Sequence, residues 1–169
     1  RCRMIAIVVT VLCCLAASAF CSVTEASFYS VPPAMVEFLQ KNKKFTAKYL
    51  THVKENIDRY IASVLIVNTV ANTVGASLAT ALAVKRLSST GAMALPIVLT
   101  ILILLFGEIT PKTLGVKQAK TFAPLVSVPF YYITKILGWT GLIWLCLTLT
   151  KHWTHEDEEK KDVSIEDIN

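Results

Sequence analysis

The chain has 169 residues, of which 54% are hydrophobic and 17% are charged, and its formal net charge is +5. Its mean hydropathy is +0.55. Because a soluble globular domain is usually only about 45–50% apolar, these values favour a polytopic membrane protein. The lysines gather beside the apolar segments instead of along one solvated face, so the basic charge does not indicate a nucleic-acid partner.

Three apolar runs are long enough, or nearly long enough, to cross a hydrocarbon core of roughly 30 Å. They are Met4–Phe20, Ile61–Val84, and Leu95–Phe106 with its continuation. The first run also has the basic start and the Ala-Ser-Ala triplet of a cleavable signal peptide. We interpret it as a retained first transmembrane helix, because it runs directly into residues 22–27 and further spanning segments follow.

The first helix carries a polar stripe. Ser18, Ser22 and Glu25 have i, i+4 and i+7 spacing, which places them on one face of an α-helix. The stripe indicates a polar lining between helices. The alternative is that each serine hydroxyl bonds back to the carbonyl four residues earlier in its own helix.

The second run contains two amides that need partners at membrane depth. Asn68 and Asn72 are four residues apart, and they could either contribute to a polar site or form interhelical hydrogen bonds. Ala71, Gly75 and Ala79 form a stripe of small residues with the same spacing. The stripe predicts that another helix packs closely against this one.

The third run ends in the motif Phe106–Lys112, which places a carboxylate and a proline at the end of an apolar segment. Pro111 has no N–H and clashes with the carbonyl four residues back, that of Gly107. A freed carbonyl beside the Glu108 carboxylate is half of a site for a hard cation, and Asn68 could add an amide oxygen. The alternative is a helix that ends at the Pro-Lys pair with a partly hydrated glutamate.

The segments between and after these runs are basic or broken. Ala34–Tyr60 follows a Pro-Pro pair, is amphipathic and lysine-rich, and predicts a helical hairpin on the cytoplasmic face, near lipid headgroups. Residues 85–91 are expected to be a loop, with Pro96 opening the third helix. Phe122–Leu149 is either a fourth span or a helix in the membrane interface, and this apolar run is expected to be broken at Pro124, Pro129, Lys135 and Gly138.

Two further groups of residues could bind metal but are not expected to do so. The five cysteines form no CxxC pair, and they are interpreted as small buried hydrophobic residues. His152 and His155 precede Glu156 in a charged tail, where an exposed pair of this kind usually binds nothing.

Three motifs together identify a family: Ser22-Val23-Thr24-Glu25-Ala26, Leu65–Asn72 and Phe106–Thr113. In this order and spacing the chain resembles the transmembrane domain of the CNNM/CorC (cyclin-M-like) magnesium transporters. The resemblance implies an all-α membrane protein in which each protomer of a homodimer has three transmembrane helices, a cytoplasmic helical hairpin and a juxtamembrane belt helix. It therefore favours the interface helix over the fourth span for Phe122–Leu149.

The resemblance also implies a domain organisation. Residues 1–150 would form the transmembrane domain, and residues 151–169 would be a charged linker toward a paired cystathionine-β-synthase-type regulatory domain, absent here. ATP would be a partner only through that domain. We expect a multi-pass protein of the plasma or inner membrane whose C-terminus is cytoplasmic.

The family's cation site, carried onto this sequence residue by residue, consists of Ser18, Ser22, Asn68, the Gly107 carbonyl and Glu108. The supporting residues would be Glu25, Asn72, Pro111 and Lys112. The family's usual Asn-Asn pair is Asn68-Thr69 here, so only its first position carries over as a ligand.

The function implied by the resemblance is Mg²⁺ export driven by inward Na⁺, with both ions using this site. The alternative is a membrane-anchored divalent-cation sensor or scaffold that regulates another transporter. An intramembrane enzyme is not expected, because the sequence contains no HExxH, no GxSxG and no paired intramembrane aspartates.

Overall fold

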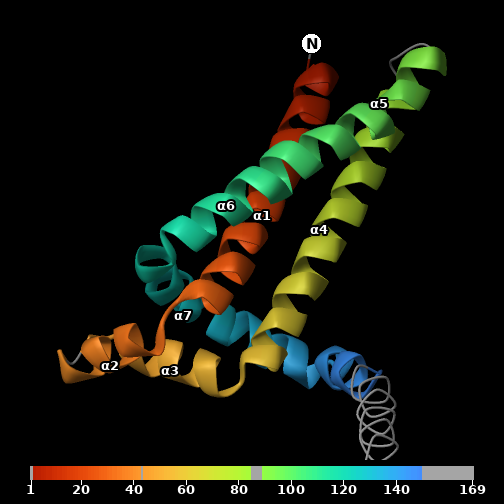
Figure 1. Ribbon diagram of the computed structural model, residues 1–169. Helices are drawn as coiled ribbons and strands as arrows, with labels where there is room; N and C mark the ends of the chain where they lie inside the picture. The colour runs from red at the N-terminus through yellow and green to blue at the C-terminus, as the bar shows by residue number, and fades with distance from the viewer. Residues whose placement is uncertain (1, 43, 85–88, 150–169) are drawn as a thin grey trace, which may run out of the picture.

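The computed structural model describes residues 2–42, 44–84 and 89–149, and every element within them is helical (Figure 1). Two spans are continuous helices, α1 (Cys2–Ser30) and α4 (Ile57–Val84). The third span is composite: α5 (Ser89–Leu102) continues through a π-helical segment, η1 (Ile103–Ile109), into α6 (Thr110–Lys117). The predicted all-α membrane protein with three spanning helices is confirmed.

These three helices expose apolar side chains on the outer surface of the bundle. Large hydrophobic side chains such as Leu12, Leu78 and Ile97 are about half exposed or more. In a soluble protein such surfaces would be buried, whereas lipid tails solvate them without cost. Three described helices are long and apolar enough to cross a membrane, or four if the bent pair at residues 119–149 is one span.

Small residues allow α1 to approach both of its neighbours closely. A Cβ added at Gly75 of α4 would lie 2.6 Å from Cys14 Sγ, and one added at Gly115 of α6 would lie 2.7 Å from the carbonyl oxygen of Val23. Ala79 is completely buried one turn after Gly75. The small-residue stripe therefore packs against another helix as predicted, and that helix is α1.

Two short helices follow the first span. The chain leaves α1 at Ser30, and Pro33 opens α2 (Pro33–Lys41), where a proline is tolerated because the first N–H groups of a helix are unpaired anyway. After a turn comes α3 (Ala47–Glu55). The Lys54 ammonium of α3 donates a hydrogen bond of 2.9 Å to the carbonyl of Phe28, in the last turn of α1. This contact ties α3 to the end of the first span.

Helix α7 (Ala119–Trp139) crosses the ends of the long helices instead of running alongside them (Figure 1). Its Phe130 is completely buried and meets Phe28 of α1 edge to face, with ring centroids 6.2 Å apart. After α7 the chain bends by 85° into a last helical segment, Leu142–Leu149, and Gly141 supplies the positive φ (76°) of that bend. The interpretation of this segment as an interface helix stays a prediction, because the bent pair also has the length and composition of a fourth span.

Three predictions about proline and loops are wrong. Pro96 lies inside α5, which already begins at Ser89, so residues 89–91 are not loop. Pro124 and Pro129 lie inside α7 without breaking it. Packing against neighbouring helices compensates for a lost backbone hydrogen bond, and the break comes instead at Gly141. The predictions for residues 85–88 and for the tail from residue 150 lie outside the described residues.

Candidate cation site

The third span changes its hydrogen-bond pattern just before Pro111. Residues 103–109 form a π-helix, and the Thr110 N–H bonds to the carbonyl of Leu105, five residues earlier. Such π-turns accommodate a residue that cannot join the α-helical ladder, and they are frequent at functional sites. The expected disruption at Gly107–Pro111 is therefore present, as a widened turn inside a helix that continues to Lys117.

Gly107 is buried in this turn, and its carbonyl faces α1. The Ser18 hydroxyl donates to that carbonyl at 3.4 Å, and Ser18 is completely buried. A Cβ at Gly107 would lie 2.8 Å from Ser18 Oγ, so only glycine allows this approach. Hydrogen bonds from a hydroxyl to a carbonyl are usually about 2.7–2.8 Å long, so this contact is a long one. Both oxygens therefore still have lone pairs that could bind another ligand.

The second span joins the same cluster through its two amides. Asn72 Nδ2 donates to Ser18 Oγ at 3.3 Å and to Asn68 Oδ1 at 3.4 Å. Ser18 thus bridges α4 and η1, instead of bonding back to its own helix. Polar groups of all three spans therefore meet at one point, which we call the Ser18 cluster (Ser18, Asn68, Asn72 and the Gly107 carbonyl).

Two members of this contact surface escaped the sequence analysis. The Cys14 thiol lies 3.6 Å from the Ala71 carbonyl and 3.8 Å from Asn72 Oδ1, one turn before Ser18 on the same face. Ser27 repeats the serine–glycine contact further along, since its hydroxyl donates to the Gly115 carbonyl at 3.3 Å. The i, i+4 spacing from Ser18 could have identified Cys14, but nothing in the sequence pairs Ser27 with Gly115.

Two of the predicted ligands, Glu108 and Ser22, have no side-chain hydrogen bond to the described members of the cluster. Glu108, next to Gly107, is partly buried, and its side chain forms no hydrogen bond or ion pair with any other described residue. Ser22 is buried on the predicted stripe of α1 but likewise has no side-chain hydrogen bond within residues 2–42, 44–84 and 89–149. The structure thus joins Ser18, Asn68, Asn72 and Gly107 by hydrogen bonds and does not join Ser22 or Glu108 to them within the described residues.

The two remaining supporting residues bind each other. The Lys112 ammonium and the Glu25 carboxylate form an ion pair of 3.1 Å, with side chains 51% and 21% exposed. The pair links α1 to α6 on the far side of Pro111, which is itself buried. Glu25 is therefore paired with a neighbouring cation, whereas Glu108 has no ion pair with any residue that the structure describes.

The chemistry of these groups fits a hard cation. The donors are two hydroxyls, an amide, a backbone carbonyl and one carboxylate, all oxygen ligands of the kind that Mg²⁺ and Na⁺ prefer. The described residues contain no group of three or more His, Cys, Asp or Glu side chains that could hold a metal ion. A thiolate or imidazole site of the zinc type is therefore not found in that part of the chain.

Comparison with known proteins agrees with this architecture. The family model described as "Cyclin M transmembrane N-terminal domain" matches residues 8–169. The chain is 35% identical to the UPF0053 protein sll1254 of Synechocystis sp. over 152 residues, covering 90% of this chain and 43% of that protein.

Two further relatives come from a plant and from another bacterium. The chloroplastic DUF21 domain-containing protein At1g55930 of Arabidopsis thaliana is 30% identical over 129 residues, covering 76% of this chain and 20% of that protein. A UPF0053 protein of Haemophilus influenzae is 27% identical over 143 residues, covering 85% and 34%. The chain thus spans less than half the length of each of these relatives. It belongs to the cyclin M transmembrane domain family and is a multi-pass membrane domain of that family.

Proposed function

We propose that this chain is the ion-translocating membrane domain of a Mg²⁺ transporter that exports Mg²⁺ in exchange for inward Na⁺. The transported ion would bind at Ser18, Ser22, Asn68, the Gly107 carbonyl and Glu108. The observation that carries this proposal is the 3.4 Å approach of Ser18 Oγ to the Gly107 carbonyl at the π-turn. It brings neutral oxygen donors from separate spans together inside an apolar bundle, one residue before Glu108 in the chain.

The donor set suits exchange between the two ions. Mg²⁺ prefers about six oxygen ligands near 2.1 Å and gives up its water reluctantly. A cage with one formal negative charge holds a divalent ion without neutralising it, so release remains possible and Na⁺ can compete. Shortening the long contacts around Ser18 toward a bound ion would require only small movements of α1 and η1.

Alternating access would come from the third span. A π-turn has a backbone pattern that can shift to α-helix, and Pro111 prevents the turn from closing into a regular ladder. We propose that the segment Gly107–Pro111 changes exposure between the Mg²⁺- and Na⁺-bound states. A series of cysteine substitutions from Gly107 to Lys112 should differ in labelling rate between the two ions, and identical rates would contradict this movement.

The orientation follows from charge. α2, α3 and the start of α7 carry lysines and lie at one end of the bundle (Figure 1), which favours the cytoplasmic side for that end and for the C-terminus. We propose a plasma- or inner-membrane homodimer, with α7 in the interface among lipid headgroups. ATP would act only through a paired cystathionine-β-synthase-type regulatory domain.

Vesicle experiments separate transport from sensing. The protein is reconstituted with a Mg²⁺-sensitive dye inside, and Mg²⁺ movement is followed after an opposing Na⁺ gradient is imposed. Transport predicts Na⁺-dependent flux that Glu108→Gln abolishes. Mg²⁺ binding without flux would instead support the alternative, a divalent-cation sensor or scaffold, and flux that is unchanged in Glu108→Gln would contradict the proposed site.

A further inference from the structure

One buried hydroxyl outside the cation site lacks a partner. Thr134 of α7 is 3% exposed, and its Oγ1 forms no hydrogen bond within the described part of the chain. Threonines in helices commonly bond to the carbonyl four residues earlier, as Thr10, Thr24 and Thr80 do here. Since buried polar atoms are nearly always paired, Thr134 points to a ligand that completes its hydrogen bonding.

The surroundings of Thr134 are suited to an anion. It lines a cavity of about 160 Å³ together with Arg59, Lys135, His52 and two tyrosines, Tyr60 and Tyr131. Neither Arg59 nor Lys135 forms an ion pair with another described residue. Arg59 lies over α7, because a Cβ at Gly138 would be 2.5 Å from its Nη2. Gly138 therefore leaves room for the guanidinium one turn after Thr134 on α7, and both residues line the cavity, where a fork of N–H donors matches phosphate oxygens.

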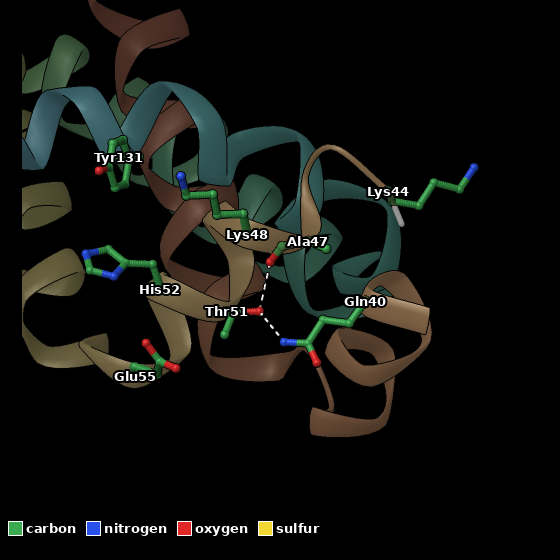
Figure 2. Close-up of a pocket in the computed structure, with 8 residues that line it drawn as sticks. All are labelled: Gln40, Lys44, Ala47, Lys48, Thr51, His52, Glu55 and Tyr131. Atoms are coloured by element: carbon green, nitrogen blue, oxygen red, sulfur yellow. Dashed lines mark hydrogen bonds between the residues drawn. The ribbon is translucent and has the colours of Figure 1, made fainter. Parts of the chain in front are cut away.

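A second cavity adjoins the first. It has a volume of about 530 Å³, is lined by residues of α2, α3, the turn between them and α7, and shares His52 and Tyr131 with the smaller cavity (Figure 2). Lys44 and Lys48 add two cations, whereas Glu55 is the one carboxylate among the residues lining either cavity. Cations thus outnumber carboxylates around the combined space, and a multiply charged anion would balance them.

The location of these cavities favours a lipid over a soluble ligand. They lie where α7 crosses the ends of the spanning helices, and α7 presents exposed apolar and aromatic side chains beside Lys135. Trp139 is 95% exposed and Ile136 66%. Exposed aromatic residues of this kind are typical of the headgroup level of a membrane.

We propose that these two cavities bind the phosphorylated headgroup of an anionic membrane lipid. A phosphate monoester occupies the smaller cavity, where it accepts hydrogen bonds from Thr134 Oγ1, Arg59 and Lys135. The remaining, hydroxyl-bearing part of the headgroup lies in the larger cavity, near Lys48 and Gln40. A lipid bound there would fasten α3, α4 and α7 to one another at the membrane surface.

The test is calorimetric titration of the detergent-solubilised full chain with three probes. These are a short-chain phosphatidylinositol phosphate, its free inositol-phosphate headgroup, and a short-chain phosphatidylcholine. We expect binding of the phosphorylated lipid, at least tenfold weaker binding of the free headgroup, and none of phosphatidylcholine. Free headgroup binding as tightly as the lipid would overturn the lipid assignment in favour of a soluble phosphate ligand.

Variants locate the site. Arg59→Gln combined with Lys135→Gln should weaken lipid binding at least tenfold, and Thr134→Val, which keeps the shape of the side chain, should weaken it several-fold. Lys117→Gln, an exposed cation at the end of α6, is the matched control and should bind as wild type does. Circular dichroism verifies that each variant is folded. If no phosphorylated lipid binds, or if the Arg59/Lys135 and Thr134 variants bind like wild type, the proposal is wrong.

Discussion

The contact between Ser18 and Gly107 depends on the small size of both residues as much as on the hydrogen bond between them. The serine is completely buried, and the glycine leaves room for its hydroxyl and no more. Asn72 then reaches Ser18 from the second span. The Ser18 hydroxyl therefore connects three helices. Adding one methyl group at this point should change the spacing of all three helices at the site.

Gly107→Ala should destabilise the protein by about 1–3 kcal/mol, because the new Cβ would lie 2.8 Å from Ser18 Oγ and 3.0 Å from Ser18 Cβ. Adding Ser18→Gly removes both of the atoms that clash and should restore much of the loss. Thermal denaturation in detergent of the two single variants and the double variant measures this. Equal stability of Gly107→Ala and wild type would contradict the close packing.

The ion pair between Glu25 and Lys112 should contribute little to stability. Lys112 is half exposed, and exposed pairs are typically worth about 0–1 kcal/mol. A double-mutant cycle with Glu25→Gln and Lys112→Met should therefore give a coupling energy within that range. A coupling of several kcal/mol would show that the pair is shielded from solvent in the membrane-embedded protein.

At the scale of elements, α1 is the helix to which the others attach. The middle of α1 packs against α4 at Gly75, and its later half packs against α6 at Gly115. Its last turn accepts a hydrogen bond from Lys54 of α3. At Gly115 the nearest atom of α1 is a backbone atom, the carbonyl oxygen of Val23. A backbone carbonyl, unlike a side chain, cannot change rotamer to make room. The third span is consequently held against α1 within the π-turn, at Gly107, and again after it, at Gly115.

Gly115→Ala should lower stability by about 1–3 kcal/mol, since α6 would have to move away from the backbone of α1. Thermal denaturation in detergent measures the loss, and Ser77→Ala on the exposed face of α4 serves as the control. If both variants melt like wild type, α6 is not held against α1 as described.

Lys54 gives the attachment of α3 a pH dependence. Burial lowers the pKa of the Lys54 ammonium from its ordinary 10.5. The folded state therefore loses this proton at lower pH than the unfolded state, so this group makes stability rise as pH increases between the lowered and the ordinary pKa. Compared with Lys54→Met, wild type should gain thermal stability across that alkaline interval; parallel curves for the two proteins would contradict it.

At the scale of the whole molecule, the sequence predicts what depends on composition and local chemistry. The three spans follow from long apolar runs, and the disruption near Gly107 follows from the missing N–H of Pro111. The hydrogen-bond partners do not follow, because the contacts of Asn72 with Ser18 and of Ser27 with Gly115 depend on how each helix is rotated. The predicted helix ends at Pro96, Pro124 and Pro129 are wrong, because packing against neighbouring helices compensates for the backbone hydrogen bond that each proline removes.

The orientation in the membrane can be measured by labelling. In a background without native cysteines, Phe45→Cys in the turn between α2 and α3 and Met93→Cys at the start of the third span are both well exposed positions at opposite ends. An impermeant thiol reagent should reach residue 93 from outside intact cells and residue 45 only after the cells are opened. The reverse pattern would place the lysine-rich end outside and contradict the proposed topology.

The central claim is that the oxygen donors around Ser18, Gly107 and Glu108 bind the transported cation. Calorimetric titration of the purified protein with Mg²⁺, with and without Na⁺, tests it most directly. We predict that wild type and the control Glu37→Gln on α2 bind Mg²⁺, that Na⁺ weakens this binding, and that Glu108→Gln and Ser18→Ala reduce the affinity at least tenfold. Binding by Glu108→Gln that equals wild type would contradict the account, and Glu108 would then be only a polar residue near the end of a helix.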